Sequence, residues 1–122
     1  MRKTEKYLER KAAVRSLSGN KPELESIRRV IVIPARGESA YLPLCLQSLA
    51  ANPASLCSAT WCIVVVNNPP PGEAGSDFYQ DNRETLRRLR ENGGDFPFCL
   101  SFVDASSPGR ELPPDAGVGL AR

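Results

Sequence analysis

Two short polar segments follow apolar runs, and their side chains are the ones that could bind a ligand. Arg36 and Glu38 come directly after the run RVIVIP, and Asn67 and Asn68 come directly after WCIVVV. An arginine can meet a phosphate, and a carboxylate can accept hydrogen bonds from a ribose or a base. An asparagine amide offers both donors and an acceptor to the edge of a base. These residue types favour a nucleotide as the ligand.

Each of these residues also has an ordinary structural explanation. Glu38 lies at the predicted start of a helix, where the helix dipole favours a carboxylate that caps it. Asn67 precedes a run of prolines, and an Asx turn there would end the strand. Arg36 can simply be an exposed, solvated side chain. From the local patterns alone the two interpretations of Glu38 are balanced, and the turn is favoured for Asn67.

Several common active sites are excluded by what the chain lacks. It has no histidine, so it has no Ser-His-Asp triad, and its four cysteines form no C-x-x-C pair that would indicate zinc. Neither the dinucleotide fingerprint nor the P-loop pattern occurs. The pair Gly117 and Gly119 is a weak phosphate-site signal. Cys45 and Cys99 lie inside apolar patterns and are expected to be small core residues.

The elements that must position these side chains follow from the apolar patterns. Three short apolar runs, at 29–34, 61–66 and 98–103, predict strands, and the first two are typical of central strands covered on both faces. Leucines and a cysteine at helical spacing predict a helix that begins at 39–42 and ends at 52. A further helix is expected at 77–91, with Asp77 as its N-cap.

Single helices between strands predict parallel pairing with right-handed crossovers. We therefore expect an α/β fold, a Rossmann-like three-layer half-sheet of parallel strands in β-α-β-α-β order, preceded by an N-terminal helix at 4–17. Ligands of open parallel sheets bind beyond the carboxyl ends of the strands. The loops 34–38, 67–76 and 104–117 are expected at that edge.

Charge is unevenly spread along the chain of 122 residues, which is long enough for one domain. Residues 1–22 hold seven of the 16 Lys and Arg residues but two of the 14 Asp and Glu residues, so we treat them as a separate basic helix. The slightly acidic remainder argues against nucleic-acid binding. We expect a solvated helix there, with peripheral contact to a membrane surface or a partner as the alternative. No signal peptide or transmembrane run is found, which predicts a cytoplasmic protein.

Three segments taken together resemble the inverting family 2 glycosyltransferases. They are VIVIPARGESAYLPLCLQSL at 30–49, IVVVNNP at 63–69 and GVGLAR at 117–122. In that family the first strand ends in a Pro-x-x-Asn-Glu type of turn, and a helix with a Leu-x-x-Cys-Leu-x-Ser-Leu pattern follows. A second strand ends in acidic or amide residues, and a later Ala-Arg opens a helix near the diphosphate. The resemblance covers most of 30–122 but not the N-terminal helix.

The resemblance implies that residues 28–122 are the N-terminal, nucleotide-sugar-binding part of a GT-A glycosyltransferase domain of the hexosyltransferase type. It places Ala35, Glu38 and Asn67 beside the nucleoside and Arg122 near the diphosphate. Asn67 stands where the family has an aspartate that contacts the base, commonly uracil, so the identity of the base is open. Gly37 stands where asparagine is common. No catalytic residue is assigned.

The family's metal-binding Asp-x-Asp, its acceptor half and its catalytic base lie beyond the matched segments, and no D-x-D occurs in this chain. The resemblance implies a divalent cation, Mn or Mg, for a complete family member and none bound by this truncated domain alone. We expect the complete protein to transfer a sugar from a nucleoside-diphosphate sugar to an acceptor. We expect this chain alone to be inactive and to bind nucleotide weakly, if at all. The alternative is a non-catalytic Rossmann-like nucleotide-binding or interaction module.

Overall fold

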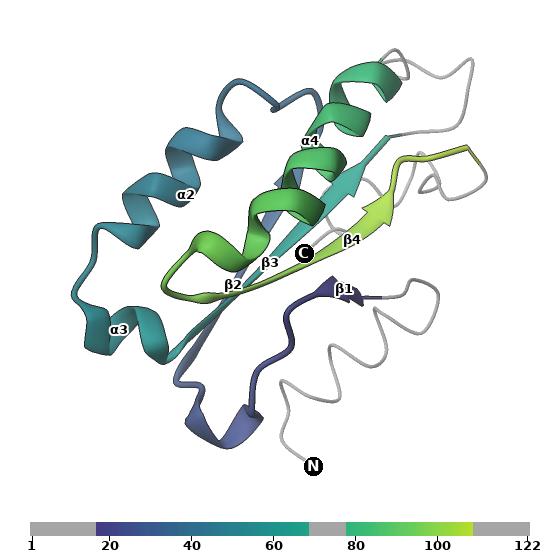
Figure 1. Ribbon diagram of the computed structural model, residues 1–122. Coiled ribbons are helices and arrows are strands. Elements are labelled where there is room, and N and C mark those ends of the chain that lie inside the picture. The colour runs from purple at the N-terminus through teal and green to yellow at the C-terminus, as the bar shows by residue number, and fades with distance from the viewer. Residues whose placement is uncertain (1–16, 69–77, 109–122) are drawn as a thin grey trace.

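The computed structural model describes residues 17–68 and 78–108, which form a four-stranded sheet with helices packed on one of its faces (Figure 1). The strands are β1 (Leu17–Gly19), β2 (Arg29–Ala35), β3 (Thr60–Asn67) and β4 (Cys99–Ala105). The α-helices are α2 (Leu42–Ala50), α3 (Ala54–Ser58) and α4 (Tyr79–Asn92), and the 3₁₀ helices are η1 (Leu24–Ser26) and η2 (Gly93–Asp95). Within these ranges no helix is long and apolar enough to cross a membrane.

The sheet has the order β1-β4-β3-β2 and is mixed. β2 pairs with β3, and β3 with β4, in parallel, but β1 runs antiparallel to β4. The prediction of a Rossmann-like half-sheet made only of parallel strands is therefore wrong. The prediction of three layers is also wrong for the described residues, because both long helices pack on the same face of the sheet.

The added strand also corrects the predicted N-terminal helix. Residues 1–16 lie outside the described part of the chain, and Leu17, the last residue expected in that helix, belongs to β1. Strand pairing is preferred here because the edge of β4 offers backbone partners, and Asn20 N donates to Leu100 O at 3.0 Å. Gly19 has a φ of 86°, and a Cβ there would lie 2.8 Å from Leu100 O. A glycine is therefore required at this point.

The main core lies between the sheet and the helices. β3 is buried along its whole length, and alternate residues of β3 and β4 face α2 and α4. The buried residues of this core include Leu42, Leu46, Cys62, Val64, Leu86, Leu89, Leu100 and Phe102. β2 is an edge strand among the described strands and is only half-buried, which corrects the prediction of a central strand. Its position explains why it tolerates Pro34, which has no N–H to donate.

The cysteines differ in burial. Cys45 is exposed, so the prediction that it is a core residue is wrong, while Cys99 is half-buried and packs against the buried cluster on the other face of the sheet. Cys57 and Cys62 are buried. Cys57 lies in α3, a short helix that the sequence patterns did not predict. Burial, with a smaller contribution from the charge of Cys45, raises the pKa of the Cys62 thiol to about 12, so this thiol is neutral near pH 7.

The other face of the sheet carries a second apolar cluster with one polar contact inside it. Trp61, Ile63, Val65 and Val103 are among its buried members. The indole Nε1 of Trp61 donates to Ser101 Oγ at 2.8 Å, and the Ser101 hydroxyl donates in turn to the backbone oxygen of Asn20. Ser101 thus links Trp61 of β3 to Asn20, the residue that follows β1.

Replacing Ser101 with alanine is expected to lower the free energy of unfolding by about 1–3 kcal/mol, because the buried indole N–H loses its acceptor. Urea unfolding followed by far-UV circular dichroism measures the loss. The control is Ser101→Ala in a Trp61→Phe background, where no indole N–H remains. An equal loss in both backgrounds would show that the indole contact contributes nothing.

Candidate functional site

The carboxyl ends of β2, β3 and β4 meet at one edge of the sheet, because these three strands are parallel (Figure 1). The side-chain amide of Asn67, the last residue of β3, lies 3.4 Å from the backbone oxygen of Ala35, the last residue of β2. Across the next pair of strands, Asn68 N donates to Ala105 O at 3.2 Å. We call the edge formed by Ala35, Asn67 and the loop 36–41 the strand-end site.

The predicted ligand residues fall into two groups in the structure. Ala35 and Asn67 are both buried and are adjacent at the strand ends, while Glu38 lies half-buried in the loop that follows β2. Arg36, in the same loop, is exposed. Arg122 lies outside the described residues, as do Asp77, Gly117 and Gly119.

The Glu38 side chain does not cap the helix that follows it, so this structural explanation for the residue is wrong. Tyr41 is the N-cap of α2, and no side chain caps this helix. Glu38 contributes to the start of α2 only through its backbone oxygen, which accepts from Tyr41 N at 3.0 Å and from Leu42 N at 2.8 Å. Its carboxylate accepts no hydrogen bond from another described residue. The Glu38 side chain is thus left for another partner.

The Asx turn considered for Asn67 also lacks the hydrogen-bond donor that it needs. In an Asx turn the side-chain oxygen accepts from the backbone N–H two residues further on. Two residues beyond Asn67 is Pro69, and two beyond Asn68 is Pro70, so neither asparagine finds the required N–H. Asn67 instead uses its amide nitrogen, at 3.4 Å from both Ala35 O and Val65 O.

The best-connected side chain at the strand-end site is Asn82, in the first turn of α4. It is completely buried and accepts from Gly37 N at 2.9 Å. Its amide nitrogen donates to Asn67 O and to Ser106 Oγ, both at 2.9 Å. One side chain therefore joins the loop that follows β2, the last residue of β3 and the residue that follows β4. A buried asparagine with this many partners stabilises one arrangement of these three segments.

Sequence reasoning missed Asn82, although a signal for it exists. Asn82, Thr85, Leu86 and Leu89 are the buried residues of α4, and they fall at i, i+3, i+4 and i+7. Extending the stripe backwards from its two leucines would have placed Asn82 on the face toward the sheet.

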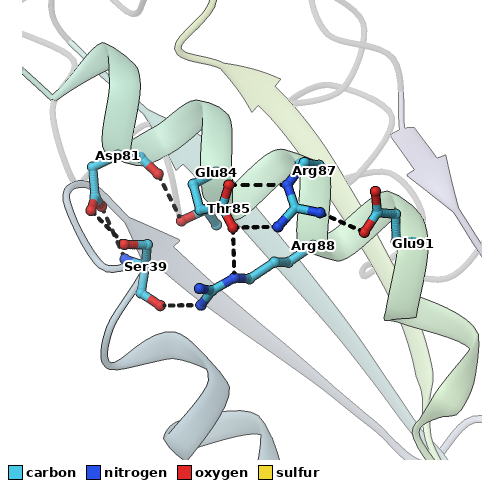
Figure 2. Close-up of polar contacts among 7 residues, drawn as sticks. All are labelled: Ser39, Asp81, Glu84, Thr85, Arg87, Arg88 and Glu91. Atoms are coloured by element: carbon cyan, nitrogen blue, oxygen red, sulfur yellow. Dashed lines mark hydrogen bonds and ion pairs between the residues drawn. The ribbon is translucent and has the colours of Figure 1, made fainter.

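A second contact holds the same loop through Ser39 (Figure 2). Asp81 Oδ2 accepts from Ser39 N at 3.0 Å, and the Ser39 hydroxyl also bonds to this carboxylate. Arg88 Nη1 donates to Ser39 O at 2.9 Å, so both backbone polar groups of Ser39 are bonded to α4. The carboxylate of Asp81 serves the loop as an internal acceptor.

The remaining charges in Figure 2 form an exposed network along α4. Glu84 bonds to Arg87 and to Arg88, and Arg87 also bonds to Glu91 at 2.7 Å. The hydrogen bond from Arg87 lowers the pKa of Glu84 to about 2, with a further contribution from Arg88. Exposed pairs of this kind contribute little to stability. We give this network no part in ligand binding.

The turn into the site depends on Gly37. Its φ is 68°, and a Cβ there would lie 2.5 Å from Cδ1 of Phe78. After β4, the Asp104 carboxylate accepts from Ser106 N at 3.0 Å and from Ser107 N at 2.9 Å. The loop after β2 and the turn after β4, the two strands that flank β3, are thus both fixed by local contacts.

Known proteins give no guide to the ligand. No family model, no curated protein and no solved structure matches this chain. The nature of the ligand must therefore be argued from the residues of the site.

Two further observations restrict the kind of ligand site that the described residues can form. A groove of about 260 Å³ lies between α2 and α4 and is lined by both apolar and polar residues. Ser39 of the loop 36–41 lines it, but neither Glu38 nor Asn67 does. Within residues 17–68 and 78–108, no group of three His, Cys, Asp or Glu side chains could hold a metal ion. The strand-end site is therefore a hydrogen-bonding site without metal ligands among the residues described.

Proposed function

We propose that the strand-end site binds the nucleoside part of a nucleotide-sugar donor, and that the chain is the N-terminal segment of a family 2 glycosyltransferase. The observation that carries the proposal is the carboxylate of the half-buried residue Glu38, which has no hydrogen-bond partner among the described residues. Glu38 lies three residues after Ala35, whose backbone oxygen is contacted by the Asn67 amide. In the complete enzyme an acceptor displaces the nucleoside diphosphate from the sugar. The isolated chain is proposed to bind the nucleoside without transferring sugar.

Each residue has a separate role in this proposal. Glu38 accepts hydrogen bonds from ribose hydroxyls or from base N–H groups, since an ionised carboxylate is a pure acceptor. Asn67 meets the edge of the base, and Ala35 offers its backbone beside it. Arg122 is proposed to lie near the diphosphate from the resemblance alone. The Mn or Mg ion of a complete enzyme finds no ligand set among the described residues, so we assign them no metal-dependent step.

We also propose a cytoplasmic location. All four cysteines are free thiols in the structure. Unpaired cysteines are the usual state in a reducing compartment.

Titration with UDP and with GDP, followed by amide NMR, tests the proposal. Binding at the strand-end site is expected to shift the signals of Ala35, Glu38 and Asn67. Shifts confined to residues 1–22 would indicate nonspecific phosphate binding to the basic segment and would count against the proposal.

Replacing Glu38 with glutamine is expected to raise the Kd of the bound nucleotide about tenfold. A hydrogen bond to a charged group contributes about 1.5 kcal/mol or more, and about 1.4 kcal/mol corresponds to a factor of ten. The matched control is Glu25→Gln, which makes the same change of charge at an exposed position in η1. Equal effects of the two substitutions would mean that only net charge matters, and the proposal would fail.

A further inference from the structure

Two neighbouring residues of α4 hold the backbone on both sides of Glu38. Asn82 Oδ1 accepts from Gly37 N at 2.9 Å, and Asp81 Oδ2 accepts from Ser39 N at 3.0 Å. Gly37 and Ser39 are the residues directly before and after Glu38. We call Asp81 and Asn82 together the α4 clamp. Although it lies more than 40 positions away in the sequence, the clamp fixes the peptide units from which the Glu38 side chain projects.

The same clamp reaches the second proposed ligand residue. Asn82 Nδ2 donates to the backbone oxygen of Asn67 at 2.9 Å. Asn82 is completely buried, and its bond to Asn67 is buried as well, so this bond is shielded from water. The relative placement of Glu38 and Asn67 is therefore set by one side chain that itself lies beneath the surface.

We propose that the α4 clamp consists of positioning residues for the nucleoside site: it holds Glu38 and Asn67 in the arrangement that the ligand requires. This inference rests on the proposed function. A site held in its binding arrangement avoids the loss of affinity that follows when the competent arrangement is only partly populated. Removing the clamp releases the loop 36–41, and the nucleotide then selects one arrangement out of several.

The test compares nucleotide affinity in clamp variants with affinity in a variant that destabilises the same helix elsewhere. Asn82→Ala removes the bonds to Gly37, Asn67 and Ser106. Leu89→Ala, two turns further along α4, opens a cavity in the core and leaves the loop contacts in place. The ligand is UDP or GDP, whichever the wild-type chain binds, at a temperature where urea titration shows every variant to be folded.

Asn82→Ala is expected to raise the Kd about tenfold, while Leu89→Ala changes it less than about twofold. The Gly37 amide provides a second readout, since it should lose protection from hydrogen exchange in Asn82→Ala and keep it in Leu89→Ala. Asp81→Asn, which retains an oxygen for Ser39 N, should recover most of the affinity that Asp81→Ala loses. If Asn82→Ala does not fold, this Asp81 pair still tests the clamp.

The outcomes separate the two proposals. Binding by the wild-type chain with an unchanged Kd in Asn82→Ala and in Asp81→Ala would overturn the clamp and leave the proposed function intact. An equal increase in Kd for Asn82→Ala and Leu89→Ala would mean that Asn82 contributes only to the stability of the fold, and it would also overturn the inference. Failure of the wild-type chain to bind either nucleotide would overturn the proposed function and the positioning role together.

Discussion

Replacing Gly37 with alanine is expected to destabilise the fold by about 2–4 kcal/mol. A left-handed backbone costs an L-residue about 1–2 kcal/mol, and the φ of Gly37 is 68°. Overpacking a core costs about 1–3 kcal/mol, and a Cβ at Gly37 would lie 2.5 Å from Cδ1 of Phe78. Because the Phe78 ring is partly exposed and can move aside, we expect the lower part of that range, about 1–2 kcal/mol. Urea unfolding followed by circular dichroism gives the total.

A double-mutant cycle separates the two causes. In a Phe78→Ala background the overlap is gone, so Gly37→Ala should cost only the backbone part, about 1–2 kcal/mol. Gly94→Ala is the matched control, because the nearest atom to its added Cβ is Asn20 Nδ2 at 3.9 Å and its φ is not positive. A large effect of Gly94→Ala, or the same cost of Gly37→Ala in both backgrounds, would contradict this explanation.

The conformation of Gly37 gives a physical reason for the residue type at this position. Glycine and asparagine are the residues that most readily adopt a left-handed backbone. The φ of 68° therefore accounts for a glycine at position 37.

The strands that flank the site could be predicted because their sequences allow little else. The runs expected at 29–34, 61–66 and 98–103 correspond to β2, β3 and β4 within two residues at each end. Continuous β-branched and apolar residues bounded by prolines and glycines specify such strands locally. The helices α2 and α4 likewise follow from helical spacing of their leucines.

β1 could not be predicted, because its three residues have no periodicity and follow a segment with strong helix formers. Its pairing is decided by the open edge of β4, which is a property of the assembled sheet. Asn82 was missed for a related reason: a polar residue in a charged helical segment looks solvated unless the buried stripe is followed through it. Both features are set by tertiary contacts, which local patterns describe least well.

Phe102 connects β1 to the core. It is 3% exposed, it lies opposite Ser18 of β1 in the register, and its ring carbons would lie 3.4 Å from a Cβ at Gly19. The guanidinium of Arg90, in α4, lies 6.0 Å from the ring centroid. Phe102 thus contacts residues of both β1 and α4.

Replacing Phe102 with alanine is expected to cost about 3–5 kcal/mol through lost burial and the cavity that remains. That is a large part of the roughly 5–15 kcal/mol that stabilises a typical domain. Arg90→Met keeps the aliphatic stem and removes the charge, and it should cost less than about 1 kcal/mol, since an exposed cation–π contact contributes about 0.5–1 kcal/mol. Comparable costs for the two substitutions would mean that the cation rather than the packing accounts for the effect of the ring.

A milder variant keeps this argument testable if Phe102→Ala does not fold. Phe102→Leu should cost about 1–2 kcal/mol and leave β3 and the helices in place. Because the ring lies against Gly19, β1 should loosen first, and the Asn20 amide, bonded to Leu100 O at 3.0 Å, should exchange faster than amides of β3. Uniform acceleration across the sheet would instead show that β1 is held by its backbone pairing alone, so that the antiparallel strand would not depend on the core beside it.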